Sequence, residues 1–199
     1  SKNRISITNL NVYQGSNSNY RFTQLSNGNE LNRLNIKSHL KGQGSDCSLS
    51  GISLTKEGHH IDNNIIINHH SPNCMSSQNF RSVLKDKSSG VYSGRTIVKS
   101  AAQKTNSSQS NKNILLSDTA KMNSNPQLEI YADDVKCSHG STTGKLNKDA
   151  IFYLRSRGLD LKSARELLLN GFVNDIIEQV KNKDIKYMLK KNINTWLNE

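Results

Sequence analysis

Cys137 and His139 are the residues of this chain whose types and spacing best fit metal chemistry. They stand two positions apart in the stretch EIYADDVKCSHG at residues 129–140. In a β-strand, residues i and i+2 point to the same face, so a thiolate and an imidazole would lie side by side. Such a pair could bind iron or zinc, although it supplies at most half of a ligand set. The alternative is a free cysteine and a hydrogen-bonded histidine at the end of a strand.

Two other groups of residues fit known sites less well. Adjacent histidines at 59–60 and 69–70, with Cys74 nearby, suggest a metal cluster. Adjacent strand residues point to opposite faces, however, so at most one histidine of each pair could serve a given site. The run GSTTGKL at 140–146 resembles a phosphate-binding loop. We reject it as a nucleotide site because it has three residues between its glycines instead of four, and Leu146 replaces the required hydroxyl.

The acidic residues offer one enzyme alternative. Glu129, Asp133 and Asp134 cluster in sequence, and polysaccharide lyases and hydrolases line acids and bases along one face of a β-helix. Asp133 and Asp134 are adjacent, however, and would face opposite ways in a strand. Neither a Ser-His-Asp arrangement nor a Gly-x-Ser-x-Gly elbow is present to support covalent hydrolysis.

Short strands must position Cys137 and His139. Between Arg4 and His139 apolar residues alternate with polar ones in short runs, which are separated by Gly, Asn, Ser and Asp. No helix-length amphipathic segment separates the runs, which excludes a βαβ sheet and leaves a sandwich, an antiparallel barrel or a β-helix. The Asn/Ser/Gln-rich residues 14–19 and 104–113 are predicted to form a loop and an exposed connection.

Helices are predicted after Gly144. Asn147 is a suitable N-cap for a helix over 148–157 that ends at Gly158, and Asp160 is a suitable cap for a second helix, which Gly171 could bend or divide. A third helix begins at Asp184, and its apolar residues form one continuous face. That face either folds back on its own domain or docks in a groove of another protein. The apolar positions of the second and third helices include Leu167, Leu168, Phe172, Ile176, Ile185, Met188, Leu189 and Trp196.

Composition restricts the function class. The 199 residues fit one domain with a small appendage. A net charge of +11 suggests nucleic acid as a partner, but the basic residues are scattered and no nucleic-acid-binding motif accompanies them, so a solvated charged surface is favoured over a basic binding module. Three widely spaced cysteines argue against a disulfide framework. No apolar run approaches the roughly 20 residues that span a bilayer, and the missing initial Met indicates a fragment or processed form.

The central stretch also resembles a known family. Residues 129–140, followed by DAIFYLRSRG at 149–158, are similar to the SufB/SufD family of iron–sulfur cluster assembly proteins, and more to its SufD-type than to its SufB-type members. The resemblance covers roughly residues 30 to 175. It continues upstream through His60-x-Asp62-Asn63, GVYSGR at 90–95, AQKT at 102–105 and LLSD at 115–118.

The resemblance implies a fold and a set of partners. It implies a right-handed parallel β-helix over 1–144, with a helical region over 145–199 that grips the SufC ATPase through the eight apolar residues named above. It assigns His60, Asp62, Asn63 and His69 to structural positions in the coil. It also implies pairing with SufB through the end of the β-helix, and without a partner the same edge would favour a homodimer.

The family also suggests what the chain would do. The resemblance implies a non-catalytic scaffold on which a transient iron–sulfur cluster is built at the shared interface, with His139 as the main site residue and Cys137 as a second candidate ligand. ATP hydrolysis would belong to SufC. No cofactor would be tightly bound to this subunit alone, and flavin in the complex is left open. The expected location is a plastid-type organelle, such as an apicoplast, or the bacterial cytoplasm, without nucleic acid or membrane as partner.

Overall fold

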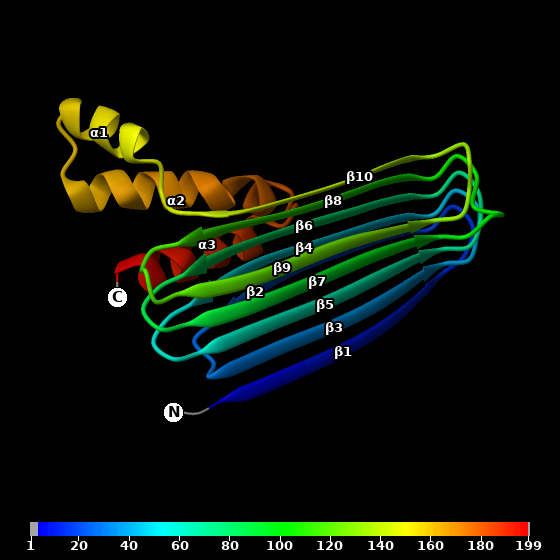
Figure 1. Cartoon of the computed structure of the whole chain (residues 1–199), viewed down its shortest axis with the longest axis horizontal. Helices are drawn as coiled ribbons and strands as arrows, with labels where there is room; N and C mark the ends of the chain where they lie inside the picture. The colour runs from blue at the N-terminus through cyan, green and yellow to red at the C-terminus, as the bar shows by residue number, and fades with distance from the viewer. Residues whose placement is uncertain (1–3, 199) are drawn as a thin grey trace.

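The strands form a two-sheet parallel β-solenoid. The computed structural model describes residues 4–198, in which ten strands alternate between two five-stranded sheets (Figure 1). Sheet A contains β1 (Ile5–Gln14), β3 (Leu31–Leu40), β5 (His60–His69), β7 (Ser89–Val98) and β9 (Lys121–Ile130). Sheet B contains β2 (Asn19–Asn27), β4 (Asp46–Thr55), β6 (Met75–Leu84), β8 (Asn106–Leu115) and β10 (Lys136–Gly144). This confirms the predicted β-helix and excludes the sandwich and the antiparallel barrel.

Each turn of the solenoid stacks in register on the next. Leu31 pairs with Ile5 on one side and with His60 on the other, and every neighbouring pair of strands is parallel. At the corner between a sheet A strand and the following sheet B strand, the same left-handed backbone position recurs in Asn17, Gly44, Asn73 and Lys104. Gly and Asn adopt this conformation most readily, which explains the Asn- and Gly-rich turns.

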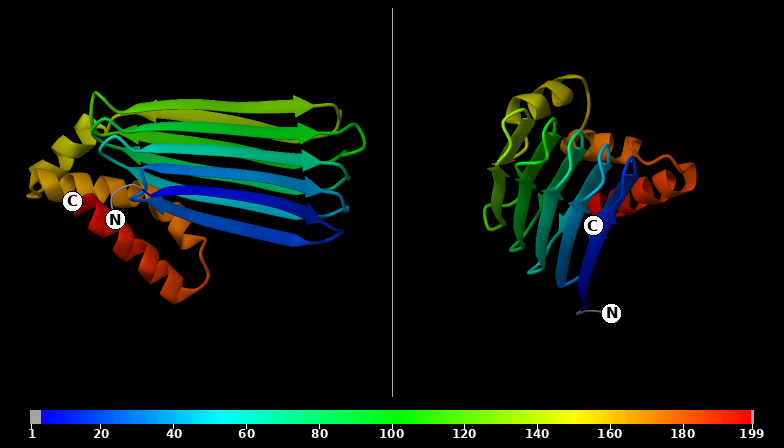
Figure 2. Two further views of the ribbon diagram at one scale, coloured as in Figure 1. Left: turned by 90° about the horizontal axis from the view of Figure 1, so that it is seen from below. Right: turned by 90° about the vertical axis from the view of Figure 1, so that its right-hand side faces the viewer.

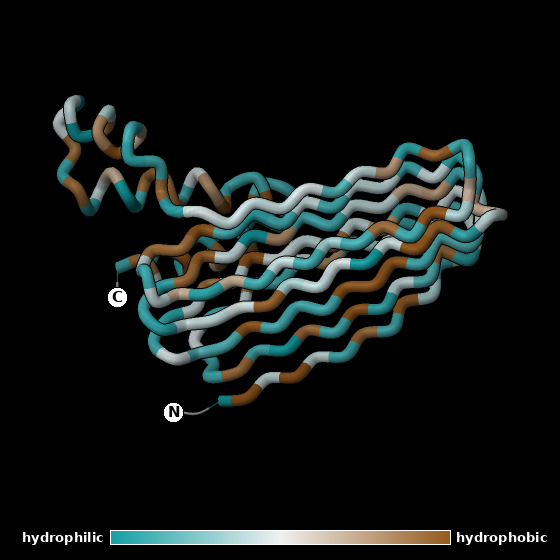
Figure 3. Tube along the Cα trace, viewed as in Figure 1, coloured by the Kyte–Doolittle hydropathy of each residue, from teal (hydrophilic) through white to brown (hydrophobic). Residues whose placement is uncertain are grey.

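The interior contains a buried apolar cluster flanked by buried polar residues. Hydropathy alternates along the sheet A strands (Figure 3), and one face of each strand faces the opposing sheet. The Phe80 ring of β6 lies over Gly51 of the neighbouring strand β4, where a Cβ would come within 2.6 Å of it, so the packing of these two sheet B strands favours a glycine there. The buried cluster between the sheets consists of Leu34, Ile36, Leu40, Cys47, Leu49, Ile65, Ile67, Cys74, Phe80 and Tyr92.

The prediction of an exposed connection at 104–113 was wrong. Most of this segment is β8, a central strand of sheet B. Its polar character misled the prediction, because Ser107, Gln109, Asn111 and Asn113 all point inward and are buried. Their side chains hydrogen-bond with one another or with neighbouring turns, so the polar interior is largely paired.

Three helices follow the last strand: α1 (Lys148–Ser156), α2 (Leu161–Glu178) and α3 (Lys183–Asn198). Asn147 and Asp160 cap α1 and α2 as predicted, and α2 continues through Gly171 without a break. α2 and α3 pack on the outer face of sheet B (Figure 2), where Ile52, Leu54 and Val83 meet Ile176 and Trp196 in a second buried cluster. Among residues 4–198 no helix is long and apolar enough to cross a membrane.

Candidate functional site

Cys137 and His139 lie at the start of β10, the edge strand of sheet B and the last strand before the helices. They pair with Ser107 and Gln109 of β8, which are buried inside the solenoid. Cys137 and His139 therefore occupy the inward face of sheet B, as their two-residue spacing predicted. No described strand pairs with the outer edge of β10, so this inward face opens to solvent at the end of the solenoid.

The Cys137 thiol sits in a small apolar corner. It is half-buried beside a cluster formed by Val98, Ala102 and Ala132. Burial raises the pKa of the Cys137 thiol, and a backbone hydrogen bond from Ser107 partly offsets that rise. The thiol is therefore protonated at neutral pH, and it would have to lose its proton to a metal or to a neighbouring base before it could act as a ligand.

The His139 imidazole is exposed and has no hydrogen-bond partner within residues 4–198. One turn below it, Gln109 donates through Nε2 to Thr96 Oγ1 over 3.0 Å, while Gln109 Oε1 is buried without a partner. The unpaired Gln109 Oε1 thus lies on the same face as His139 and in register with it. The His139 ring is available to a new partner. His139 has the freedom that an interface ligand or an acid–base group requires.

A polar network joins the two edge strands beneath the opening. Asn111 Oδ1 accepts hydrogen bonds from Asn113 Nδ2 and from Ser124 Oγ, each over 2.7 Å. Ser141 of β10 donates to Ser124 of β9, also over 2.7 Å, and so connects the sheets across the interior. Ser141 and Ser124 stand 17 positions apart in the sequence, which gave no signal that they would meet.

The edge of β10 is ready to pair with another strand. The Lys136 N–H donates to the Thr105 carbonyl on the β8 side. Because N–H groups alternate in direction along a parallel strand, those of Cys137, His139 and Ser141 point to the unpaired side. β9 forms the corresponding edge of sheet A at the same end of the molecule. An open end with two unpaired edges favours association with another β-rich subunit.

The other histidines make contacts within the solenoid. His69 is fully buried and hydrogen-bonds through Nε2 with Ser76 Oγ over 2.8 Å. His60 bonds with Ser89 on the neighbouring turn. His70 points to the opposite side from His69 and lies 3.1 Å from a ring nitrogen of His39. Within residues 4–198 no three His, Cys, Asp or Glu side chains are grouped as a metal site.

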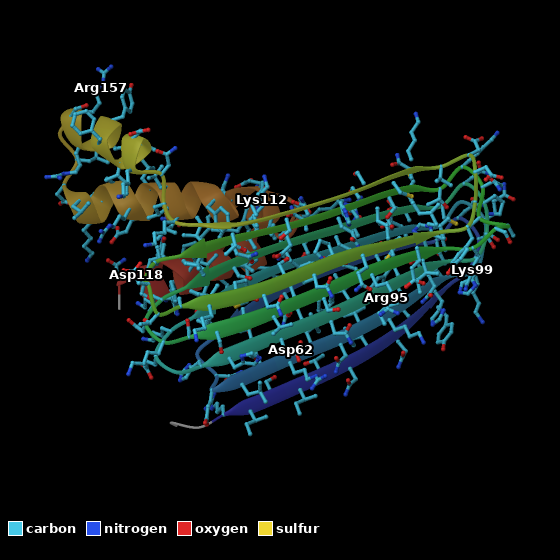
Figure 4. All side chains as sticks on the ribbon, in the orientation of Figure 1. Asp62, Arg95, Lys99, Lys112, Asp118 and Arg157 are labelled. Atoms are coloured by element: carbon cyan, nitrogen blue, oxygen red, sulfur yellow. The ribbon has the colours of Figure 1, made fainter. Side chains whose placement is uncertain are left out.

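The acidic residues do not form a catalytic row. Asp133 and Asp134 lie in the corner between β9 and β10, where both are exposed, so the assumption that they belong to a strand was wrong. Glu129 forms an ion pair with Arg95 over 3.5 Å. Arg95 and Asp62 belong to sheet A, well away from the helices (Figure 4). The run at 140–146, which resembled a phosphate loop, is mostly extended edge strand.

The eight apolar helix residues divide into two groups. Ile176 of α2 and Leu189 and Trp196 of α3 are buried, so these three cannot contact a partner directly. Their apolar face folds back on sheet B, one of the two possibilities that the sequence left open. Leu168 and Phe172 are half-buried, whereas Leu167, Ile185 and Met188 are exposed. The sequence interpretation missed two exposed aromatic residues of α1, Phe152 and Tyr153, although their positions in an amphipathic helix were visible.

Comparison with known proteins gives a consistent result. A family model described as "SUF system FeS cluster assembly, SufBD core domain" matches residues 1–172. The iron–sulfur cluster assembly protein SufD of Escherichia coli is 33% identical over 159 residues, which are 80% of this chain and 38% of that protein. An iron–sulfur cluster assembly SufBD family protein of Synechocystis is 34% identical over 85% of this chain and 37% of its own.

A plant relative shows the same partial coverage. The chloroplastic protein ABCI7 of Arabidopsis thaliana is 32% identical over 185 residues, which are 92% of this chain and 38% of that protein. The chain therefore spans about two fifths of the length of these three relatives.

Proposed function

Because the chain belongs to the SufB/SufD family of the SUF iron–sulfur cluster assembly system, we propose that it is part of a SufD-type scaffold subunit. The scaffold pairs with SufB through the open end of the solenoid, and a transient cluster is assembled at that interface. The observation that carries the proposal is the placement of Cys137 and His139 on the inward face of an unpaired edge strand. Relatives from bacteria and a chloroplast suggest the bacterial cytoplasm or a plastid as its location.

The chemistry of the site fits a shared ligand set. One thiol and one imidazole complete half of a four-coordinate iron or zinc site, so the partner supplies the remaining ligands. Pairing at the β10 edge would bring those ligands over the open mouth of the solenoid. His139 acts there as a ligand or as the acid–base group that takes up the proton of Cys137. The scaffold turns over no substrate of its own.

The helical region supports binding of the SufC ATPase. Its exposed apolar side chains, which include Phe152, Tyr153, Leu167, Ile185 and Met188, have no cover among residues 4–198. Ile176 and Trp196 contribute by holding α2 and α3 on sheet B. Motion at the helices would reach Cys137 along β10, over about 25 Å for eight strand residues. Sheet B is the rigid element that would transmit it.

The test is reconstitution of the complex. The chain is captured with SufB and SufC, loaded anaerobically with iron and sulfide, and measured by visible absorption. His139→Ala should leave both partners bound but lower the sulfur-to-iron charge-transfer absorption at least severalfold, since the variant removes the exposed imidazole only. His60→Ala, on the outer face of sheet A, is the matched control. Normal absorption with His139→Ala would remove the site from the proposal, and failure to capture either partner would remove the function.

A second arm tests the SufC surface. Leu167→Asp places a charge on an exposed apolar position of α2 and should reduce capture of SufC, while pairing with SufB is unchanged. Tyr13→Asp, a comparable exposed change on sheet A, should leave both partners bound. Equal capture of SufC by the two variants would mean that α2 does not contact the ATPase.

A further inference from the structure

A pocket lies where the helical region meets the end of the solenoid. It has a volume of about 560 Å³, which suits a single small organic ligand. Its walls come from the ends of β6 and β8, the linker before α1, the start of α1, the first half of α2 and the end of α3. Asp118, next to this region, lies at the helical end of the solenoid, and Lys99 lies at the opposite end (Figure 4).

The pocket has an apolar floor. The floor residues are buried or half-buried and come from four separate segments, so the surface exists only in the folded chain. Trp196 is the aromatic residue of this floor, and Lys85 Nζ lies 4.5 Å from the centre of its ring. The floor consists of Leu115, Leu116, Leu146, Ile151, Leu169, Trp196 and Leu197.

The rim of the pocket is basic. Lys148, Lys162 and Arg165 are exposed at its edge. Lys162 approaches Glu166 at 3.8 Å, but Lys148 and Arg165 have no ionic partner within residues 4–198. A fourth cation, Lys145, is already paired with Asp118. The uncompensated charge beside an apolar floor is complementary to a ligand that is itself anionic at one end and apolar at the other.

We propose that this pocket binds an amphipathic organic anion. The apolar body of the ligand lies on the leucine and tryptophan floor, and its carboxylate or phosphate pairs with Lys162, Arg165 and Lys148. Guanidinium and ammonium groups both recognise these anions through charge-assisted hydrogen bonds. The pocket lies at the other end of β10 from Cys137 and His139, so the proposal is independent of the cluster-assembly function.

The test uses two fluorescent probes that differ in charge. The anion 8-anilinonaphthalene-1-sulfonate carries a sulfonate on the same fused rings as neutral N-phenyl-1-naphthylamine. Trp196 is the only tryptophan of the chain, so energy transfer from it reports a probe bound nearby. Dodecanoate and dodecyl phosphate are added as competitors to distinguish a carboxylate from a phosphate ligand, with inorganic phosphate as the competitor that lacks an apolar body.

Charge reversal at the rim should weaken binding of the anionic probe. The variant Lys162→Glu/Arg165→Glu should raise its Kd at least about tenfold, while the Kd of the neutral probe changes less than about twofold. Lys121→Glu/Lys191→Glu makes the same change of net charge at exposed positions outside the pocket and should leave both Kd values close to those of the original chain. A cooperative thermal transition confirms that each variant is folded.

Three results would overturn the proposal. Equal weakening by the two double variants would show attraction to net charge alone. An unchanged Kd in Lys162→Glu/Arg165→Glu would show that the rim does not bind the anion. Displacement of the probe by inorganic phosphate as effective as displacement by dodecanoate or dodecyl phosphate would show that the apolar floor contributes nothing.

Discussion

At the scale of single residues, the histidines of this protein differ in burial and in hydrogen-bond partners. His69 is enclosed between the sheets, where burial and the nearby His70 lower its pKa to about 4. His139 also faces the interior of the solenoid, but from sheet B and at the open end, where no residue among 4–198 hydrogen-bonds with it. Burial and partners therefore distinguish two residues that the sequence presents as the same chemical type.

The buried His69 predicts a dependence of stability on pH. The unfolded chain takes up a proton near the ordinary pKa of about 6.5, whereas the folded protein takes it up only near pH 4. The free energy of unfolding should therefore decrease as the pH falls from about 6.5 toward 4, by up to about 3 kcal/mol. Urea unfolding at pH 7.5 and pH 5 measures this decrease.

A matched pair of variants isolates the effect. His69→Gln keeps a partner for Ser76 but cannot titrate, so it should lose less stability between the two pH values than the original chain does. His60→Gln, at a half-buried position in the same strand, should retain the full decrease. The same pH dependence in all three proteins would assign it to other groups.

At the scale of elements, the last turns of the solenoid replace an apolar interior with a hydrogen-bonded one. β8 contributes Gln109 and Asn111 in register with Leu49 and Phe80 of earlier turns, whereas Asn113 continues a row of buried serines. A polar interior loses less free energy than an apolar one when it is exposed at an open end, because its groups can bind water. The arrangement therefore suits a solenoid that ends in a binding surface.

Asn111 is central to this polar interior and provides a test. Asn111→Leu keeps the branched shape of the side chain but removes the acceptor for Asn113 and Ser124, and it removes the side-chain donor to the Phe80 carbonyl. We expect a loss of about 1–3 kcal/mol in the free energy of unfolding, measured by urea denaturation. Lys112→Leu, on the exposed face of the same strand, should change it by less than about 0.5 kcal/mol. Equal effects would mean that the network does not stabilise the fold.

The three helices differ in how much of their apolar surface they bury. α2 and α3 bury their apolar faces on sheet B, and Arg81 of β6 donates to the Phe172 carbonyl and pairs with Asp175. Lys186 and Lys190 bind Glu178 and hold its pKa at about 2. α1 buries no residue and leaves Phe152 and Tyr153 exposed. The helical region thus has a fixed inner layer and an outer layer available to a partner.

At the scale of the whole molecule, β9 and β10 leave two unpaired strand edges at the end of the solenoid that carries Cys137 and His139, and we expect association there. A chain with such an end should pair with itself when SufB is absent, and we expect a concentration-dependent homodimer in sedimentation velocity. Ser141→Pro removes an outward N–H, which an edge strand tolerates, and should shift the protein to monomer. Ser141→Ala removes the same hydroxyl and keeps the N–H, so it should still dimerise. A dimer unaffected by Ser141→Pro would lie on another surface.

The sequence by itself determined the local features. Period-two alternation predicted strands, Asn147 and Asp160 predicted the starts of two helices, and the spacing of Cys137 and His139 predicted a shared face; all are confirmed. Each depends on residues only a few positions apart. Resemblance of the motifs at 129–140 and 149–158 to a family supplied the parallel topology, which alternation alone could not distinguish from a sandwich or a barrel.

Only the tertiary structure decided what depends on distant residues. Segment 104–113 is too polar to be predicted as a core strand, and it becomes one because Thr96, Ser124 and Thr143 from other turns bind its side chains. Trp196 and Met188 belong to one apolar stripe in the sequence, yet one is buried and the other exposed because sheet B covers only part of α3. Whether a residue is buried depends on the residues that pack against it. In a solenoid those residues lie about one whole turn away in the chain.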